Sequence, residues 1–205
     1  MKSQKLLVIA AIVCLLVGAS GAAMAVTLFD CGDGSINGGT YDAIVLTEYE
    51  DCVIVGVTVT PGGVSVRNPR LFSLINSYVK NGDVRVRRDD KSLEPSTASI
   101  LNNVVTNGDI VISELDEADI RQNRVVNGYI QVFDDQSLPD QYAEVIQNRI
   151  KNGSIWVNYN LAASVIENTT IEGDITCLDN VLVDARCNEA VQGRVRCSRD
   201  LLPGE

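Results

Sequence analysis

Histidine is absent from the 205 residues, and aromatic residues make up only 5% of them, with a single tryptophan. Because histidine is missing, catalysis by serine or cysteine lacks its usual general base. P-loop chemistry also lacks its partner groups. No segment after position 25 is apolar enough to span a bilayer. The sequence therefore contains no catalytic motif of these kinds, and its charge distribution and repeats are the remaining guides to its organisation.

The N-terminal segment, 1–25, has the pattern of a secretory signal peptide. Lys2 and Lys5 supply the positive charge that precedes an apolar run over positions 6–17. Positions 23–25, Ala-Met-Ala, fit a small-x-small cleavage site. The apolar run is shorter than the ~20 residues of a membrane-spanning helix, and Cys14 lacks the preceding small residue of a lipoprotein signal. We therefore expect residues 1–25 to be cleaved and residues 26–205 to form one secreted or periplasmic domain.

The negative net charge limits the kinds of molecule that the protein is expected to bind. The chain has 17 basic and 27 acidic residues, for a net charge of −10; loss of Lys2 and Lys5 with the signal peptide leaves −12. Such a protein repels nucleic acid and anionic lipid, so neither is an expected partner, and no membrane contact is expected after cleavage. Five cysteines remain, and in an exported protein they are disulfide candidates before they are metal ligands.

Two nearly identical phrases show that the chain is built from repeats. QNRVVNGYIQV occupies residues 122–132, and QNRIKNGSIWV occupies residues 147–157. Counting from the glycine of each phrase gives about eight units of 20–26 residues. The anchors of these units are Asp42, Gly62, Gly82, Gly108, Gly128, Gly153, Gly173 and Gly193.

Apolar residues, mainly β-branched, recur at fixed positions of each unit and alternate with polar residues. Two positions after the anchor stand Ile44, Val64, Val84, Ile110, Ile130, Ile155, Ile175 and Val195. Further apolar columns lie four positions after the anchor and three and eight positions before it. This alternation is typical of strands and not of helices. No unit could bury its apolar face alone, so the units are expected to stack.

Asparagine forms a further column. It stands five positions before the anchor at Asn37, Asn103, Asn123, Asn148, Asn168 and Asn188. Like asparagines on successive coils can form hydrogen bonds from amide to amide along a stack. Asn-Gly pairs at the anchors, as at Asn127, suit turn positions with positive φ.

The phrases VIQNRIKNGSIWV (145–157) and VIENTTIEGDITC (165–177) resemble the right-handed parallel β-helices, or pectin-lyase-like solenoids. The resemblance covers nearly all of the chain from 26 to 205. It implies an all-β fold, a right-handed parallel β-helix of about eight coils, each about 20–26 residues long. A pentapeptide-type or left-handed solenoid is the alternative, but the apolar positions do not recur every five residues. Because unrelated functions share such coils, the resemblance predicts architecture and not activity.

Stacked coils also predict the disulfides. Cys177 and Cys197 occupy one position on consecutive coils, and Cys31 and Cys52 lie about one coil apart. Neighbouring strands are ~4.8 Å apart, within the Cα–Cα range of ~4.4–6.8 Å for a disulfide. We expect Cys31–Cys52 and Cys177–Cys197, each stapling one end, with Cys187 as the odd thiol. A Cys177–Cys187 bond is the main competitor.

Acidic loops form the first candidate site. Inserts at residues 87–95 (RRDDKSLEP) and 133–140 (FDDQSLPD) leave the stack on one side, with an acidic turn at residues 113–119 between them. The acidic edge expected from them comprises Asp89, Asp90, Glu114, Asp116, Glu117, Asp134 and Asp135. Clustered carboxylates can bind Ca²⁺, and no other cofactor is expected. The alternative is that these turns keep the protein soluble and discourage association.

Outward-facing aromatic and basic residues form the second candidate site. It comprises Tyr129, Trp156, Arg124, Arg149 and Lys151, with Tyr78 and Lys80 two coils earlier. Aromatic rings can stack on sugars, and arginine or lysine can pair with uronate or sulfate groups. An anionic glycan could then lie along the stack. The alternative is a set of unrelated surface residues.

Catalysis has weaker support. The related polysaccharide hydrolases use aspartates with a nearby histidine, which this chain lacks; the related lyases use Ca²⁺ with an arginine or lysine base. No motif of either can be matched residue by residue, so no catalytic residue is assigned. We expect an exported, non-catalytic module that binds a polysaccharide along its outer strand face. The alternatives are a lyase or glycoside hydrolase using the acidic edge, or a surface assembly protein in which Cys187 could pair between chains.

Overall fold

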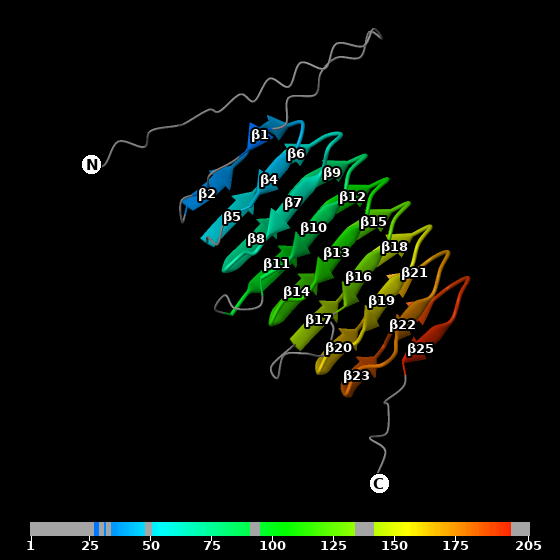
Figure 1. Cartoon of the computed structure of the whole chain (residues 1–205). Helices are drawn as coiled ribbons and strands as arrows, with labels where there is room; N and C mark the ends of the chain where they lie inside the picture. The colour runs from blue at the N-terminus through cyan, green and yellow to red at the C-terminus, as the bar shows by residue number, and fades with distance from the viewer. Residues whose placement is uncertain are drawn as a thin grey trace, which may run out of the picture.

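The computed structural model describes residues 27–28, 31, 34–47, 51–90, 95–133 and 142–197. These residues form strands and turns and no helix, so they include no helix that could span a membrane. The strands stack coil upon coil along one axis (Figure 1). The predicted all-β parallel β-helix of about eight coils is thereby confirmed. The predicted signal peptide, residues 1–25, lies outside the described residues.

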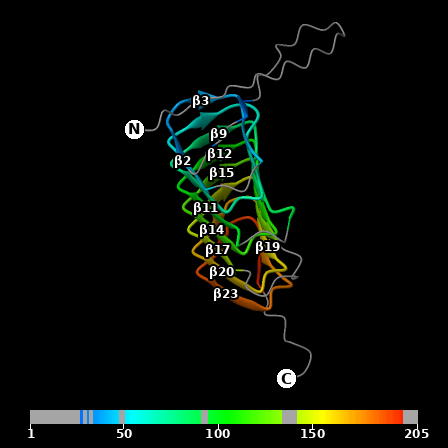
Figure 2. The ribbon, with the colours of Figure 1, turned by 60° about the vertical axis from the view of Figure 1, so that its left-hand side comes forward.

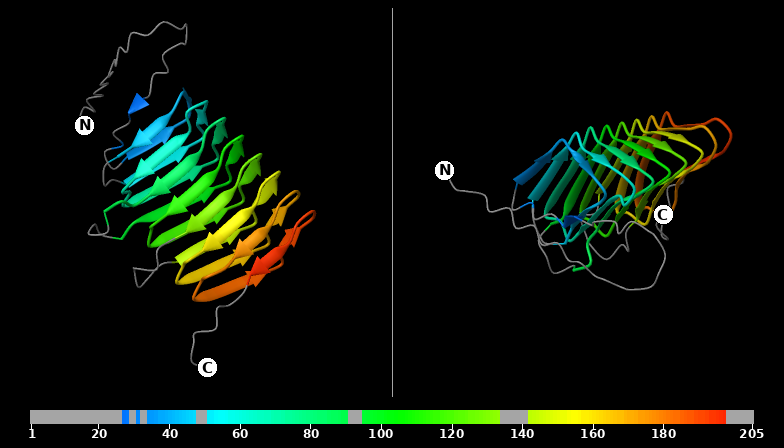
Figure 3. Two further views of the ribbon diagram at one scale, coloured as in Figure 1. Left: turned by 45° about the vertical axis from the view of Figure 1, so that its right-hand side comes forward. Right: turned by 90° about the horizontal axis from the view of Figure 1, so that it is seen from above.

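Each coil contributes one strand to each of three parallel sheets, named here A, B and C, and the chain passes from B to C to A (Figures 2 and 3). Sheet A contains β1 (Thr27–Leu28), β4 (Ile44–Leu46), β7 (Val64–Arg67), β10 (Val84–Arg87), β13 (Ile110–Ser113), β16 (Ile130–Phe133), β19 (Ile155–Asn158), β22 (Ile175–Cys177) and β25 (Val195–Cys197). Sheet B contains β2 (Gly34–Asn37), β5 (Asp51–Val55), β8 (Leu71–Ile75), β11 (Thr97–Leu101), β14 (Glu117–Arg121), β17 (Tyr142–Ile146), β20 (Ala162–Ile166) and β23 (Leu182–Arg186). Sheet C contains β3 (Thr40–Tyr41), β6 (Thr58–Val59), β9 (Tyr78–Lys80), β12 (Val104–Thr106), β15 (Arg124–Val126), β18 (Arg149–Lys151), β21 (Thr169–Thr170) and β24 (Glu189–Ala190).

The apolar columns predicted from the sequence coincide with the strand register. Val84 pairs with Val64 on one side and with Ile110 on the other, and this column continues through sheet A. Its members from Ile44 to Ile175 are almost completely buried. Alternate residues of each strand point into the coil, so stacking removes the apolar side chains from water.

The anchor glycines are required by close approach between coils. A Cβ built on Gly128 would collide with the carbonyl oxygen of Gly108, and one built on Gly153 would collide with that of Gly128. The positive φ falls on the preceding asparagines, such as Asn107 (53°) and Asn127 (55°). Asparagine tolerates this conformation better than most residues. In each Asn-Gly pair, the asparagine therefore adopts the positive φ and the glycine allows the close approach between coils.

The buried asparagine column comprises Asn103, Asn123, Asn148 and Asn168, and it continues to the half-buried Asn188. The Asn148 side chain accepts from the backbone N–H of Asn123 at 3.0 Å and donates to the backbone oxygen of Ile120 at 2.8 Å. It also donates to Oδ1 of Asn168 at 3.0 Å. The column therefore satisfies backbone groups that water cannot reach.

Asn37 was wrongly predicted to belong to this column. It lies in β2, where it pairs with Val55, and its exposed side chain donates to the Ser35 hydroxyl at 2.8 Å. The cause is a shorter first coil. Thr40 pairs with Thr58, whereas Ile44 pairs with Val64, so the first step along sheet C is two positions shorter than the step along sheet A. Counting back from the next coil by the usual coil length therefore shifted the register by two positions.

Two disulfides join neighbouring coils near the two ends, and they are the pairs predicted. Cys31–Cys52 has a Cα–Cα distance of 5.6 Å, and Cys177–Cys197 one of 4.5 Å. Cys187 is free and exposed, so the competing Cys177–Cys187 bond is excluded. Disulfides are typical of proteins that function in an oxidising compartment.

Candidate functional site

Tyr129 and Trp156 form a stacked aromatic pair. Tyr129 follows Gly128 in the turn between β15 and β16, and Trp156 lies in β19 of the next coil. Their ring centroids are 4.7 Å apart, and the ring planes differ by 14°. Tyr129 is 40% exposed, and its backbone N–H donates to Oδ1 of Asp109 at 2.8 Å. The structure thus brings together two aromatic residues that the sequence analysis assigned to one site.

The stacked pair leaves part of each ring available. One face of each ring is covered by the other ring, while the exposed part of Tyr129 remains open to solvent. Trp156 is flanked in sheet A by Gln131 and Thr176, whose side chains can form hydrogen bonds. Rigid aromatic surface beside polar groups suits the apolar C–H face and the hydroxyl groups of a sugar.

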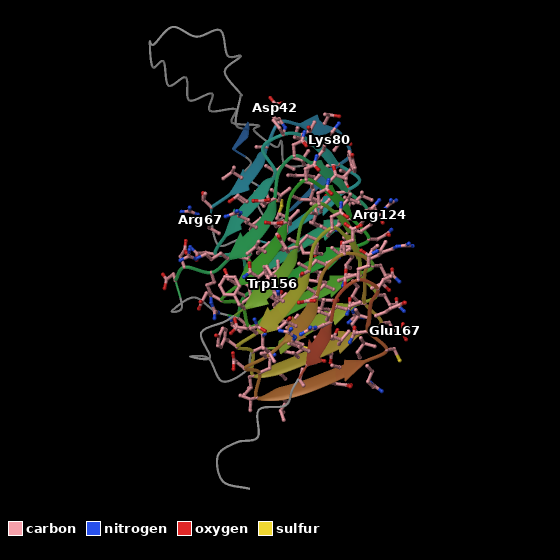
Figure 4. All side chains as sticks on the ribbon, turned by 90° about the vertical axis from the view of Figure 1, so that its right-hand side faces the viewer. Asp42, Arg67, Lys80, Arg124, Trp156 and Glu167 are labelled. Atoms are coloured by element: carbon pink, nitrogen blue, oxygen red, sulfur yellow. A yellow bond between two sulfur atoms is a disulfide. The ribbon has the colours of Figure 1, made fainter. Side chains whose placement is uncertain are left out.

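The three predicted basic residues lie on sheet C. Arg124 in β15 pairs with Arg149 in β18, and Lys151 lies two positions beyond Arg149 on the same outer face. All three are exposed at the surface of the sheet. Figure 4 shows Arg124 toward the right of the view and Trp156 nearer the middle. The five predicted residues are therefore divided between two neighbouring surfaces, the stacked pair at sheet A and the cations on sheet C.

The predicted acidic edge does not form one cluster among the described residues. Asp116 accepts from Nη1 of Arg88 at 2.5 Å and from the backbone N–H of Ser96 at 2.6 Å. Asp89 forms an ion pair with Nε of Arg87 at 2.5 Å. In the part of the chain that the structure describes, no three histidine, cysteine or acidic side chains are grouped to hold a metal ion. Two members of the predicted edge, Asp134 and Asp135, lie outside the described residues.

Arg88 is a structural residue that the sequence did not reveal. Its side chain is only 2% exposed and reaches Asp116 on the next coil with both terminal nitrogens. In the sequence it belongs to the charged stretch RRDD and resembles its exposed neighbour Arg87. Because an isolated buried charge is costly, the pairing with Asp116 fixes the start of the insert against the stack.

A recess at the ends of β13 and β16 is too small for a typical ligand site. It is lined in part by Ser113, Glu114, Phe133, Tyr142 and Asn160, and its cavity volume is about 10 Å³, roughly the room that one water molecule needs. Small-molecule sites usually occupy ~300–1,000 Å³. This recess therefore does not account for a bound substrate, and the outer sheet surfaces remain the better candidates.

Comparison of the chain with known protein families, with curated proteins and with solved structures finds no match. The assignment of function therefore depends on the surface chemistry of the solenoid itself.

Proposed function

We propose that the protein is an exported, non-catalytic β-helix module that binds an extracellular polysaccharide on its outer surface. The observation that carries the proposal is the stacked pair of the exposed Tyr129 and the half-buried Trp156, beside polar side chains of sheet A. The same proposal includes a pectin-lyase-like affiliation. Two features support this affiliation. Each coil contributes a strand to each of three parallel sheets, and a column of buried asparagines runs along the stack, as the resemblance to such solenoids implies.

Export and the absence of catalysis are part of the proposal. Two disulfides support an oxidising destination. The chain has no histidine, and two carboxylates of the acidic edge, those of Asp89 and Asp116, are engaged by arginines. Both points favour binding over general acid–base chemistry, which needs carboxylates that face a substrate.

A glycan array tests the proposal directly. Wild-type protein is expected to be retained on a subset of polysaccharides, and Trp156→Ala should lose that retention because the ring stack is removed. Tyr159→Ala is the matched control, since Tyr159 is 47% exposed and lies just beyond the end of β19, outside the stacked pair. Failure of the wild type to bind any glycan, or unchanged retention of Trp156→Ala, would overturn the proposal.

The enzyme alternative has its own test. A lyase acting on uronate polymers releases unsaturated ends that absorb ultraviolet light, and a hydrolase releases new reducing ends. The proposal predicts neither product on prolonged incubation. Product formation that is lost on Asp89→Asn would instead assign catalysis to the acidic loops.

Assembly through the C-terminal coil is a second candidate function. Val195 is 43% exposed, whereas Ile175, its neighbour one coil earlier, is completely buried. Leu182 and Val191 are 49% and 57% exposed. Sedimentation analysis over a range of concentrations tests this candidate: Val195→Asp should abolish any self-association that the wild type shows, and a strictly monomeric wild type would exclude it.

A further inference from the structure

Six of the eleven arginines in the described part of the chain have a carboxylate partner. The pairs are Arg70–Asp51, Arg85–Asp83, Arg87–Asp89, Arg88–Asp116, Arg121–Asp119, Arg121–Glu144 and Arg186–Asp184. Arg124 and Arg149 form no ion pair with any described residue, and each is the other's register partner on neighbouring strands. Two exposed arginines thus stand side by side without a counter-ion in a chain of net charge −10.

This arrangement carries an energetic cost. Neighbouring strands are ~4.8 Å apart, and like charges directly opposite one another destabilise a sheet. Arg67, Arg194 and Arg196 also have no ion pair within the described residues, but no strand pairing joins any of them to a second unpaired arginine. The adjacent pair is therefore not explained by its contribution to folding.

The surrounding surface extends the positive charge. Lys80 and Lys151 are exposed on the same sheet, and the strands β9, β12, β15, β18 and β21 contain no aspartate or glutamate. Lys80, Arg124, Arg149 and Lys151 are named here the cationic strip. Figure 4 shows two of its members, Lys80 and Arg124, along one side of the solenoid.

Neutral amides border the cationic strip. On the turn toward sheet A, Asn127 donates to Asn107, and Asn152 donates to Asn127, at 2.8 Å each. On the turn from sheet B, Gln147 donates to the carboxylate of Glu167 at 2.7 Å; the amide is neutral, so Glu167 keeps its negative charge. Among the described residues, no ion pair joins this carboxylate to Arg124 or Arg149, and the four cations of the strip outnumber it.

We infer that the cationic strip binds an anionic polysaccharide, one that carries uronate or sulfate groups, with its chain running along the solenoid axis. The inference rests on the proposed function and specifies the ligand class. Guanidinium groups bind carboxylate and sulfate oxygens through paired hydrogen bonds. Arg124 and Arg149 present one such group on each of two successive coils, so a polymer with regularly spaced charges can engage both. Bound anions also remove the repulsion between the two arginines.

Affinity measurements with three polymers test the inference: polygalacturonate, dextran sulfate and uncharged dextran. Wild type should bind at least one charged polymer, less tightly as salt rises. Arg124→Gln/Arg149→Gln should weaken that binding about tenfold, the effect of roughly one charge-assisted hydrogen bond. Arg85→Gln/Arg87→Gln, a matched control with the same charge change but with each arginine already paired to an aspartate, should stay within about twofold.

The comparison between polymers separates the inference from the proposed function. Retention of neutral glycans without any preference for charged ones would overturn the inference and leave the proposed function standing. Binding of no glycan at all would overturn both. Equal affinity for single-stranded DNA would show non-specific attraction of polyanions and would also overturn the assignment to polysaccharide.

A stability measurement tests whether Arg124 and Arg149 serve instead to stabilise the fold. Without ligand, Arg124→Gln/Arg149→Gln should leave the thermal midpoint unchanged or raise it, because a like-charge pair has been removed. A lower midpoint would show that the two arginines stabilise the fold, which contradicts the inference. Preference between polygalacturonate and dextran sulfate then identifies the anionic group.

Discussion

Among the described residues, the two longest asparagine columns are a largely buried one at the start of sheet C and an exposed one in the turn between sheets C and A. In the buried column, the Asn148 amide donates both to Asn168 and to the backbone oxygen of Ile120. In the exposed column, Asn127 donates to Asn107 and accepts from Asn152, and solvent water can reach these amides. The buried column continues to Asn188, whereas the exposed column ends at Asn152.

The difference shows where the repeat is constrained. Inside the coil, every polar group must find a protein partner, because an unsatisfied buried group costs ~1–3 kcal/mol. Outside, water replaces a missing partner, so residues can vary between coils without loss of the fold. Tyr129 on one coil and Ser154 at the equivalent position of the next illustrate that freedom. Outward residues that depart from the repeat are therefore the candidates for function.

The largest effect is expected where backbones approach inside the stack. Gly128→Ala should destabilise the protein by about 4 kcal/mol or more, since its Cβ would collide with a backbone carbonyl that cannot move freely. Chemical denaturation measures the loss. Gly56→Asn is the control: Gly56 has open space and a φ of 67°. Its stability should be unchanged or up to ~1 kcal/mol higher, and equal losses at the two sites would contradict the close-approach argument.

An isosteric change at both columns tests the comparison of buried and exposed asparagines. Asn148→Asp should cost about 3 kcal/mol, because a carboxylate cannot donate to Ile120 or Asn168 and would be buried with its charge. Asn127→Asp should cost less than about 1 kcal/mol, since water serves the exposed groups. Thermal or urea unfolding of the two variants decides the point. Similar losses would show that burial does not distinguish the columns.

Removal of the C-terminal disulfide, Cys177–Cys197, should lower the stability by an intermediate amount. Cys177→Ala/Cys197→Ala opens a loop with a sequence separation of 20, whose closure is worth ~3 kcal/mol in the chain-entropy description. Amide hydrogen exchange should increase first in β23, β24 and β25, which form the exposed last coil. Cys187→Ser should change neither quantity, because this thiol is exposed and free. Uniform exchange along the chain would contradict local stapling.

The smallest effect concerns an ion pair on the outer face of sheet B. Hydrogen bonds from Arg70 to the Asp51 carboxylate hold the pKa of Asp51 below its ordinary value of 3.8. A lowered folded pKa stabilises the protein above about pH 4, and the benefit disappears as pH falls through the folded value. Asp51→Asn should therefore lower the midpoint slightly at pH 6, and the difference from wild type should shrink as the pH falls below about 4. Because the pair is exposed, a large difference at pH 6 would be unexpected.

The fold could be predicted because inward positions repeat. A single count from Gly82 through Gly193 placed the columns of sheet A in the register that the structure has. The same count put Cys177 opposite Cys197, so the disulfide followed from the coil length. It failed at Asn37, because the first coil is two positions shorter between sheets C and A.

The candidate site could be predicted only in part. Tyr129 and Trp156 occupy different positions of the repeat, so their stacking depends on side-chain directions that a column count does not contain. Among the described residues, the predicted acidic edge forms no metal-binding cluster, for a related reason. Nothing in the stretch RRDD distinguishes the buried Arg88 from the exposed Arg87. The ion pair between Arg88 and Asp116 could therefore not be predicted from the sequence. Outward and loop residues lack neighbours of the same type, and repetition gives no guide to their contacts.

The most direct test of the account is affinity electrophoresis in gels that contain an anionic polysaccharide. The account predicts that wild type is retarded by polygalacturonate or dextran sulfate. A variant carrying Trp156→Ala, Arg124→Gln and Arg149→Gln should run as in a polymer-free gel while still unfolding in one cooperative thermal transition. Equal retardation of the two proteins, or no retardation of the wild type in any gel, would contradict the claim that the outer surface of this solenoid binds polysaccharide.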